Sequence, residues 1–119
     1  MARILLVSYI PELLQERERV LREAGYEVTL GPSYAAACMA IDQETFDVAV
    51  LGFSVPEEER NQMARALKAY SSSTQIIMIY FASVENTELA DALIPTSAGA
   101  EDVLRAVNHI ISKRREHLA

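Results

Sequence analysis

A short apolar run followed by a glycine and an acidic stretch constrains the fold of this chain most. Residues 47–51 (DVAVL) are mostly aliphatic or β-branched, and the run is too short for an ordinary globular helix. Such a run is typical of a strand that is buried on both faces, as in a parallel sheet. Gly52 ends it, and Pro56 opens a predicted helix whose first turn carries three glutamates. Because ligands bind at the carboxyl ends of strands in a doubly wound sheet, a functional site is expected near Gly52.

Similar apolar runs recur along the chain and alternate with amphipathic stretches. Gly25 is expected to end the first helix and Ser33 to cap the second. Alternation of this kind predicts a parallel sheet with helices on both faces. The predicted strands cover residues 3–7, 27–30, 47–51, 75–80 and 92–94, and the predicted helices start at Pro11, cover 34–44 and 57–70, and start again at Ser97.

The segment between the last two predicted strands is short. Only residues 81–91 separate the end of one strand from the start of the next. A parallel crossover needs roughly a dozen residues or more, including its helix. We therefore expect a shortened fourth helix of a turn or two.

Composition narrows the classes of function. The 119 residues predict one domain, 1–119, and the net charge of −6 argues against a nucleic-acid surface on it. No apolar run is long enough to span a membrane, and the amino terminus does not have the pattern of a signal peptide. The lone Cys38 cannot form an internal disulfide. These features favour a cytoplasmic protein with no membrane contact.

Four stretches, in this order and spacing, resemble the receiver domain of response regulators. Residues 4–11 (ILLVSYIP) resemble its first-strand motif, and 46–56 (FDVAVLGFSVP) its third-strand motif. Residues 25–28 (GYEV) resemble the turn into strand two, and 90–94 (ADALI) the run into the last strand. The resemblance implies a CheY-like, flavodoxin-like fold with strand order 2-1-3-4-5. It also implies signal transduction in a two-component system.

The same resemblance implies a degenerate site. In receivers, two acidic residues and an acceptor Asp hold Mg²⁺, and a Thr or Ser and a Lys bind the phosphoryl group. Matched position by position, the acidic pair falls on Ser8 and Tyr9, the acceptor on Gly52, the hydroxyl on Tyr80 and the lysine on Pro95. These side chains supply no phosphoacceptor and are poor Mg²⁺ ligands. We therefore expect no catalytic residue, no metal site and no cofactor.

Other reactive side chains have simpler interpretations. Asp47 begins its strand, at the wrong end to replace the acceptor. Cys38 lies among Ala and Ile and is expected to be an inert core thiol. His109 and His117 have no third ligand nearby in the sequence and are expected to face solvent.

The sequence thus predicts a non-enzymatic pseudo-receiver that works by contact with a protein partner or a second copy, without phosphorylation. Helix one or the last helix is the expected contact surface. The alternative is an atypical receiver that still accepts a phosphoryl group or a small ligand at the carboxyl ends of the strands.

Overall fold

The structure, a computed structural model, describes residues 2–80 and 89–118, and side chains as far as residue 114. The elements are β1 (Arg3–Val7), α1 (Pro11–Glu23), β2 (Glu27–Gly31), α2 (Tyr34–Gln43), β3 (Val48–Leu51), α3 (Glu57–Tyr70), β4 (Gln75–Tyr80), β5 (Ala92–Pro95) and α4 (Ala100–Leu118). None of the described helices is long and apolar enough to cross a membrane.

The five strands form one parallel sheet in the order β2-β1-β3-β4-β5. This confirms the predicted doubly wound, flavodoxin-like arrangement. The register aligns the carboxyl ends of the strands, because Val7 pairs with Leu51 and Leu51 pairs with Met78. At the far edge Tyr80 pairs with Pro95. Residues that follow different strands are thereby brought to one edge of the sheet.

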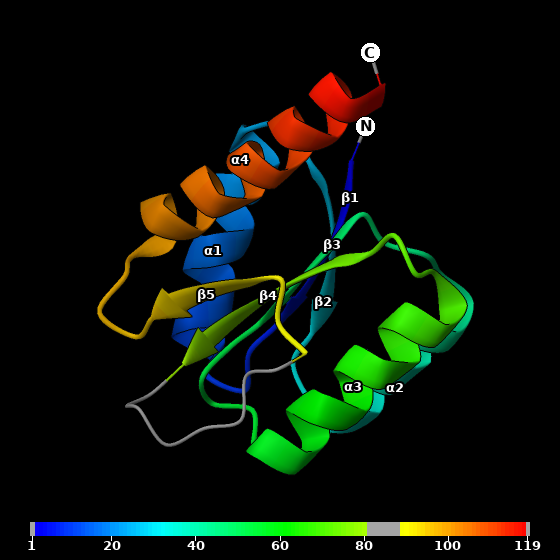
Figure 1. Cartoon of the computed structure of the whole chain (residues 1–119). Coiled ribbons are helices and arrows are strands. Elements are labelled where there is room, and N and C mark those ends of the chain that lie inside the picture. The colour runs from blue at the N-terminus through cyan, green and yellow to red at the C-terminus, as the bar shows by residue number, and fades with distance from the viewer. Residues whose placement is uncertain (1, 81–88, 119) are drawn as a thin grey trace.

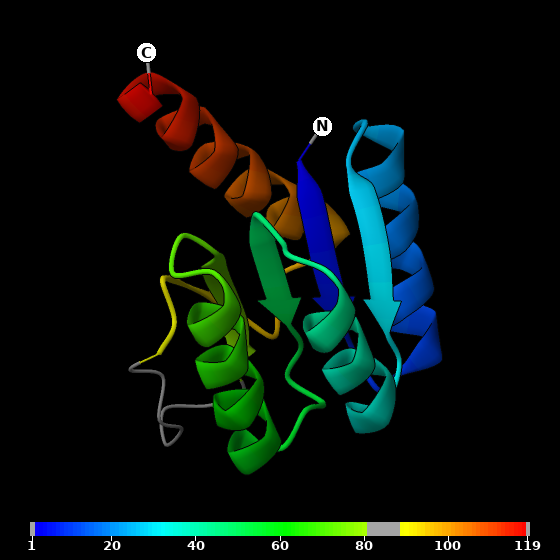
Figure 2. The same ribbon diagram turned by 90° about the vertical axis from the view of Figure 1, so that its right-hand side faces the viewer.

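Helices cover both faces of the sheet. Helices α1 and α4 pack together on one face, and α2 and α3 lie side by side on the other (Figures 1 and 2). Alternate strand residues serve the two layers: Leu5 and Val7 join the core under α2 and α3, while Ile4 and Leu6 join the core under α1 and α4. The strands are apolar on both sides because each side is covered, as the sequence predicted.

Local signals set most element boundaries. Pro11 occupies the first turn of α1, where its missing N–H costs nothing. The chain leaves α1 through Gly25, whose φ of 97° suits a residue without Cβ. Ser33 caps α2, since its Oγ accepts the Ala36 N–H at 3.1 Å.

The start of the last helix differs from the sequence prediction. Helix α4 begins at Ala100 rather than at Ser97. Gly99 takes the capping position, because its carbonyl accepts the N–H groups of Asp102 and Val103 at 3.0 and 3.3 Å. Asp102 in turn accepts the Gly99 N–H through Oδ2 at 3.0 Å. The predicted shortened fourth helix falls largely on residues 81–88, outside the described part of the chain.

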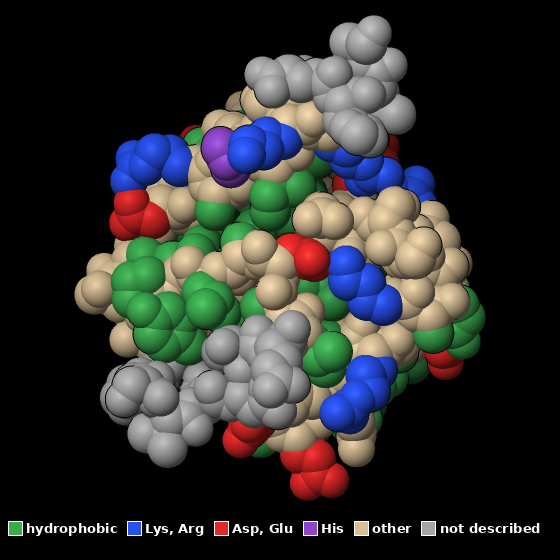
Figure 3. All heavy atoms as spheres, in the orientation of Figure 1, with side chains coloured by type: hydrophobic (Ala, Val, Ile, Leu, Met, Phe, Trp, Pro, Cys, Tyr) green, Lys and Arg blue, Asp and Glu red, His purple; other side chains and the backbone are tan. Residues whose placement is uncertain are grey.

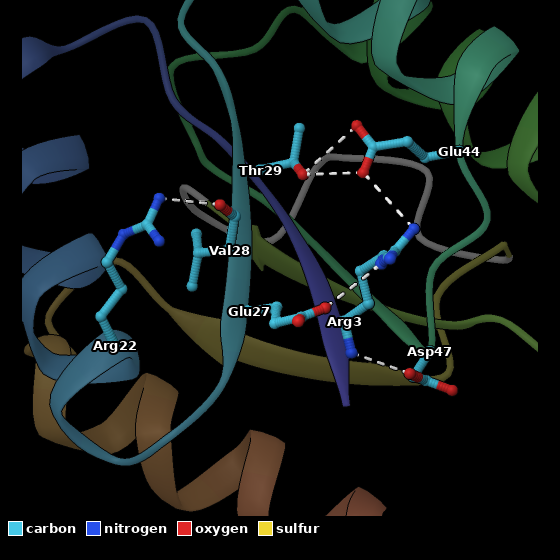
Figure 4. Close-up of polar contacts among 7 residues, drawn as sticks. All are labelled: Arg3, Arg22, Glu27, Val28, Thr29, Glu44 and Asp47. Carbon is cyan, nitrogen blue, oxygen red and sulfur yellow. Dashed lines mark hydrogen bonds and ion pairs between the residues drawn. The ribbon is translucent and has the colours of Figure 1, made fainter. Parts of the chain in front are cut away.

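Polar contacts join the elements at the amino-terminal end of the sheet (Figure 4). Asp47 Oδ2 accepts the Arg3 N–H at 2.8 Å, and the Arg3 side chain lies 3.5 Å from Glu27 and 3.7 Å from Glu44. Asp47 Oδ1 also accepts from Arg114 Nη1 at 2.8 Å, which fastens the far half of α4 to the sheet. Asp47 therefore stands opposite the carboxyl edge, as expected, and acts as a structural acceptor.

Candidate functional site

The five residues selected from the sequence lie at the carboxyl edge of the sheet. Ser8 and Tyr9 follow β1, Gly52 follows β3, and Tyr80 and Pro95 end β4 and β5. The pairing of β1 with β3, β3 with β4 and β4 with β5 sets these positions along one edge. The strand topology therefore brings them to the place where this class of sheet holds its ligands.

Ser8 directs its hydroxyl into the turn that starts α1. The residue is only 1% exposed. Its Oγ accepts the Ile10 N–H at 3.3 Å and lies 3.4 Å from the Ile10 carbonyl oxygen, to which it can donate. Ile10 is the residue that precedes α1 and has no side-chain cap of its own. Ser8 thus supports the beginning of the helix.

Tyr9 links the end of β1 to α3. Its N–H donates to Ser54 Oγ at 2.9 Å, and its hydroxyl donates to Glu59 Oε1 at 2.7 Å. The ring packs against the core beneath α2 and α3. Burial, followed by the hydrogen bond to Glu59, raises the pKa of the Tyr9 phenol above its ordinary value. The phenol therefore stays neutral and is held by a carboxylate.

Gly52 permits a close approach between two strands. Its N–H donates to the Val7 carbonyl at 2.9 Å. A Cβ at this position would stand 2.9 Å from the same carbonyl oxygen, a contact that real side chains essentially never make. It would also stand 3.4 Å from Arg17 Nη1 and 3.5 Å from the Ser8 Cβ. Any side chain here requires the strand ends to move.

Arg17 is the residue of this region that the sequence did not identify as part of the site. It lies with Leu14, Val20 and Leu21 on the buried side of α1, with 3% exposure. Its Nη1 is enclosed and has no hydrogen-bond partner among the described residues. Burial lowers the pKa of the guanidinium, while the charge of Glu16 acts in the opposite direction. An arginine at an apolar position of a helical stripe was the available signal.

Tyr80 and Pro95 finish the edge on the side of β5. Tyr80 is half-buried and Pro95 is exposed. The Tyr80 carbonyl accepts the Thr96 N–H at 3.1 Å, so the strand pairing continues one residue past β5. Proline offers neither an ammonium group nor an N–H at this position.

The remaining candidates lie elsewhere. Cys38 is half-buried on α2, which corrects the expectation of a core thiol: it follows Ala37, which faces the core, by one helical step. His109 is exposed, as expected, while the side chain of His117 lies outside the described residues. Within residues 2–80 and 89–114, no three His, Cys, Asp or Glu side chains are grouped so that they could hold a metal ion.

No protein-family model and no curated protein sequence matches this chain. Solved structures do resemble it. A CheY-like response-regulator receiver domain protein from Methanospirillum hungatei JF-1 superimposes with a TM-score of 0.86, at 23% identity over 98% of both chains. The response regulator TrrA from Thermotoga maritima, in complex with Mg²⁺ and BeF, gives 0.74 at 19% identity over 92% of this chain and 99% of that one. A Burkholderia pseudomallei response regulator with a phosphorylated aspartic acid gives 0.77 at 17% identity, over 100% of this chain and 74% of that one.

At these identities the likeness establishes the fold. The chain has the CheY-like fold of response-regulator receiver domains, with a five-stranded parallel sheet in the order 2-1-3-4-5.

Proposed function

We propose that this chain is a degenerate receiver, a non-enzymatic signalling domain that acts by protein contact and does not depend on phosphorylation. The proposal rests on which residues stand at the five positions of the carboxyl edge and on what they contact. None of them is a carboxylate, and Ser8 and Tyr9 use their side-chain oxygens in contacts with Ile10 and Glu59. The position aligned with the phosphoacceptor is Gly52, which has no nucleophile and no room for a Cβ.

The residues at this edge do not fit the Mg²⁺ that the fold implies. Mg²⁺ requires near-octahedral oxygen ligands and is usually held by one or two carboxylates. Here the corresponding groups are a hydroxyl bonded within its own turn, a phenol bonded to a carboxylate, and a glycine. The buried cation of Arg17 lies beside Gly52 and opposes a second positive charge by Coulomb repulsion.

Acetyl phosphate with Mg²⁺ tests the loss of phosphorylation. Intact-mass spectrometry should find no phosphoryl adduct on the wild-type chain, while a receiver that has an acceptor Asp is labelled in the same mixture. An acid-labile, Mg²⁺-dependent adduct on this chain would contradict the proposal and favour the alternative of an atypical phosphoacceptor.

The face formed by β5 and α4 is the contact surface that we propose. On this face a groove of about 590 Å³ includes Ala92 and Ile110, with His109 and Lys113 on the helix side. Figure 3 shows hydrophobic side chains gathered over β5 and below α4, with the histidine and basic side chains next to them. Apolar surface bordered by charge is typical of an interface.

A second copy of the chain is the partner that fits this face best. Helix α4 is acidic at its start, with Glu101 and Asp102, and basic toward its end, with Lys113 and Arg114. A two-fold axis pairs the same surface on both subunits. Antiparallel packing of two α4 helices would therefore set the acidic end of each against the basic end of the other, around the apolar residues of the groove.

Light scattering across a concentration series tests this dimer. The wild type should approach the dimer mass, and Ile110→Glu should remain a monomer because two carboxylates would be buried between the α4 helices. Met39→Glu is the matched control, since Met39 is 60% exposed on α2, on the other face of the sheet. A wild-type monomer at the highest concentration, or equal effects of both variants, would contradict the proposed dimer.

A further inference from the structure

The groove between β5 and α4 lies at the opposite end of the sheet from the five edge positions. Gln75 and Ala92 are the first residues of β4 and β5, and both line the groove, together with Ile110 of α4. Its volume of about 590 Å³ falls within the range of about 300–1,000 Å³ that is usual for pockets holding small organic ligands. The groove therefore has room for such a ligand, away from the carboxyl edge.

The acidic side chain of the groove is already neutralised. Asp91 Oδ2 accepts the Ile76 N–H at 2.7 Å and lies 2.9 Å from Lys68 Nζ. The Asp91 N–H donates to the Ile76 carbonyl at 2.8 Å, which holds the residue against β4. Arg114 is paired as well, since its Nη1 donates to Asp47 Oδ1 at 2.8 Å. These two lining residues thus add little net charge to the groove.

Lys113 is the charged lining residue that keeps a free charge. Its side chain is exposed and forms no ion pair within residues 2–80 and 89–114. His109 lies one helical turn before it and borders the groove on the same side. Ala92 and Ile110 supply apolar surface next to these two polar heads. In a chain whose net charge is −6, this is a local cationic site beside an apolar wall.

We propose that a small organic anion with an apolar body binds in this groove and competes there with the second copy of the chain. An aromatic carboxylate is the simplest ligand of this class. Its carboxylate pairs with Lys113 Nζ in a charge-assisted hydrogen bond, while its ring covers Ala92 and Ile110. In the dimer proposed above, the same basic end of α4 meets the acidic end of its neighbour, so the ligand takes the place of that acidic group. The competition rests on the proposed dimer, whereas the binding does not.

The probe is 2-naphthoate, and its uncharged analogue 2-naphthamide is the matched control ligand. In ¹⁵N–¹H correlation spectra at constant ionic strength, the amide signals of Ala92 and Ile110 should move in a saturable way as 2-naphthoate is added. The amide signal of Met39, on the other face of the sheet, should stay in place. Equal affinity for the two probes, or shifts that do not saturate, would overturn the proposed anion site.

Two substitutions on α4 test the role of Lys113. Lys113→Gln should weaken 2-naphthoate binding by about three- to fivefold, as expected for the loss of an exposed ion pair, and leave 2-naphthamide binding unchanged. Arg105→Gln removes the same charge outside the groove, where Arg105 pairs with Asp102, and should leave the binding of both probes unchanged. Equal weakening by the two variants would indicate a general charge effect and overturn the site.

Light scattering then tests the competition. At a concentration where the wild type is dimeric, 2-naphthoate should lower the mass toward that of the monomer, and 2-naphthamide should do so less. Saturable binding with an unchanged dimer mass would overturn the competition. Saturable binding to a chain that is monomeric at every concentration would contradict the proposed dimer and leave the anion site in place.

Discussion

The Tyr9 hydroxyl donates a hydrogen bond of 2.7 Å to Glu59 Oε1, and this bond ties the end of β1 to the first turn of α3. The Tyr9 N–H adds a second tie, to Ser54 in the loop that precedes the helix. Here a direct side-chain bond joins neighbouring segments.

Tyr9→Phe removes the hydroxyl and keeps the ring in place. We expect a loss of about 1 kcal/mol in the free energy of unfolding, because a partly exposed hydrogen bond to a carboxylate is lost. Urea denaturation measures the change. Tyr70→Phe is the control: Tyr70 also donates to a carboxylate, Asp42 at 2.9 Å, but it is 58% exposed, and its loss should be smaller. Equal losses of unfolding free energy in the two variants would show that the Tyr9 hydrogen bond stabilises the fold no more than the exposed Tyr70 bond does.

The raised pKa of Tyr9 also gives a pH dependence. The folded state holds the phenolic proton more tightly than the unfolded state, in which the pKa is about 10. The stabilising contribution is therefore complete below about pH 10 and is lost as the pH rises further toward the folded pKa. The stability difference between wild type and Tyr9→Phe should shrink over that alkaline range. A constant difference would mean that the proton is not held by the fold.

Three substitutions of Gly52 separate steric from electrostatic effects at this position: Gly52→Ala, Gly52→Asn and Gly52→Asp. Each introduces a Cβ 2.9 Å from the Val7 carbonyl oxygen, so each should destabilise the chain, by about 1–3 kcal/mol for alanine. At neutral pH we expect the Asp variant to be more stable than the Asn variant, because only a carboxylate can pair with Arg17. Urea denaturation of the three variants gives both comparisons.

The pH dependence of these variants shows whether burial or the Arg17 guanidinium has the larger effect on the pKa of the carboxyl group in Gly52→Asp. Burial alone raises the pKa of an acid, whereas a guanidinium at this distance lowers it. We expect the guanidinium to dominate. The advantage of Gly52→Asp over Gly52→Asn should then be complete above the unfolded pKa of about 3.9 and be lost as the pH falls below it. An advantage for the Asn variant at neutral pH would show that burial dominates.

Asp47→Ala should loosen the far half of α4. Asp47 accepts from the Arg3 N–H and from Arg114 Nη1, each at 2.8 Å, and the alanine leaves both donors without this acceptor. We expect a loss of about 1–2 kcal/mol, together with faster amide exchange over residues 110–114. Glu27→Ala is the control, since its 3.5 Å pair with Arg3 is exposed and should contribute less than about 0.5 kcal/mol. Unchanged exchange in α4 would contradict this role.

The sequence predicted the sheet well because each strand carries its own signal. Runs such as 75–80 (QIIMIY) are apolar on both faces, and Gly25 and Ser33 mark helix ends through backbone geometry and side-chain capping. The start of α4 was missed because Ser97 is a good capping residue by type, whereas Gly99 caps through its carbonyl and a returning bond from Asp102. Residue type alone does not show which of these two ways of capping the helix the chain uses.

The environment of Arg17 could not be read from the sequence for a different reason. Its burial follows from helical periodicity, but its distance to Gly52 depends on how α1 packs over β1 and β2. Local patterns do not encode that packing. The five edge positions were selected through a family pattern, whereas the cation beside Gly52 became visible only in three dimensions.

The proline at the end of β5 also bears on how copies of the chain can meet. Alternate residues of a strand direct their backbone groups to opposite sides, and the Thr96 N–H bonds inward to Tyr80. Ile94 therefore faces β4, while the backbone positions of Leu93 and Pro95 face the outer edge of the sheet. Of these two, only Leu93 has an N–H to offer an incoming strand. An edge with few donors resists the addition of further strands. Pro95 thus limits the open-ended addition of strands from other copies at this edge of the sheet.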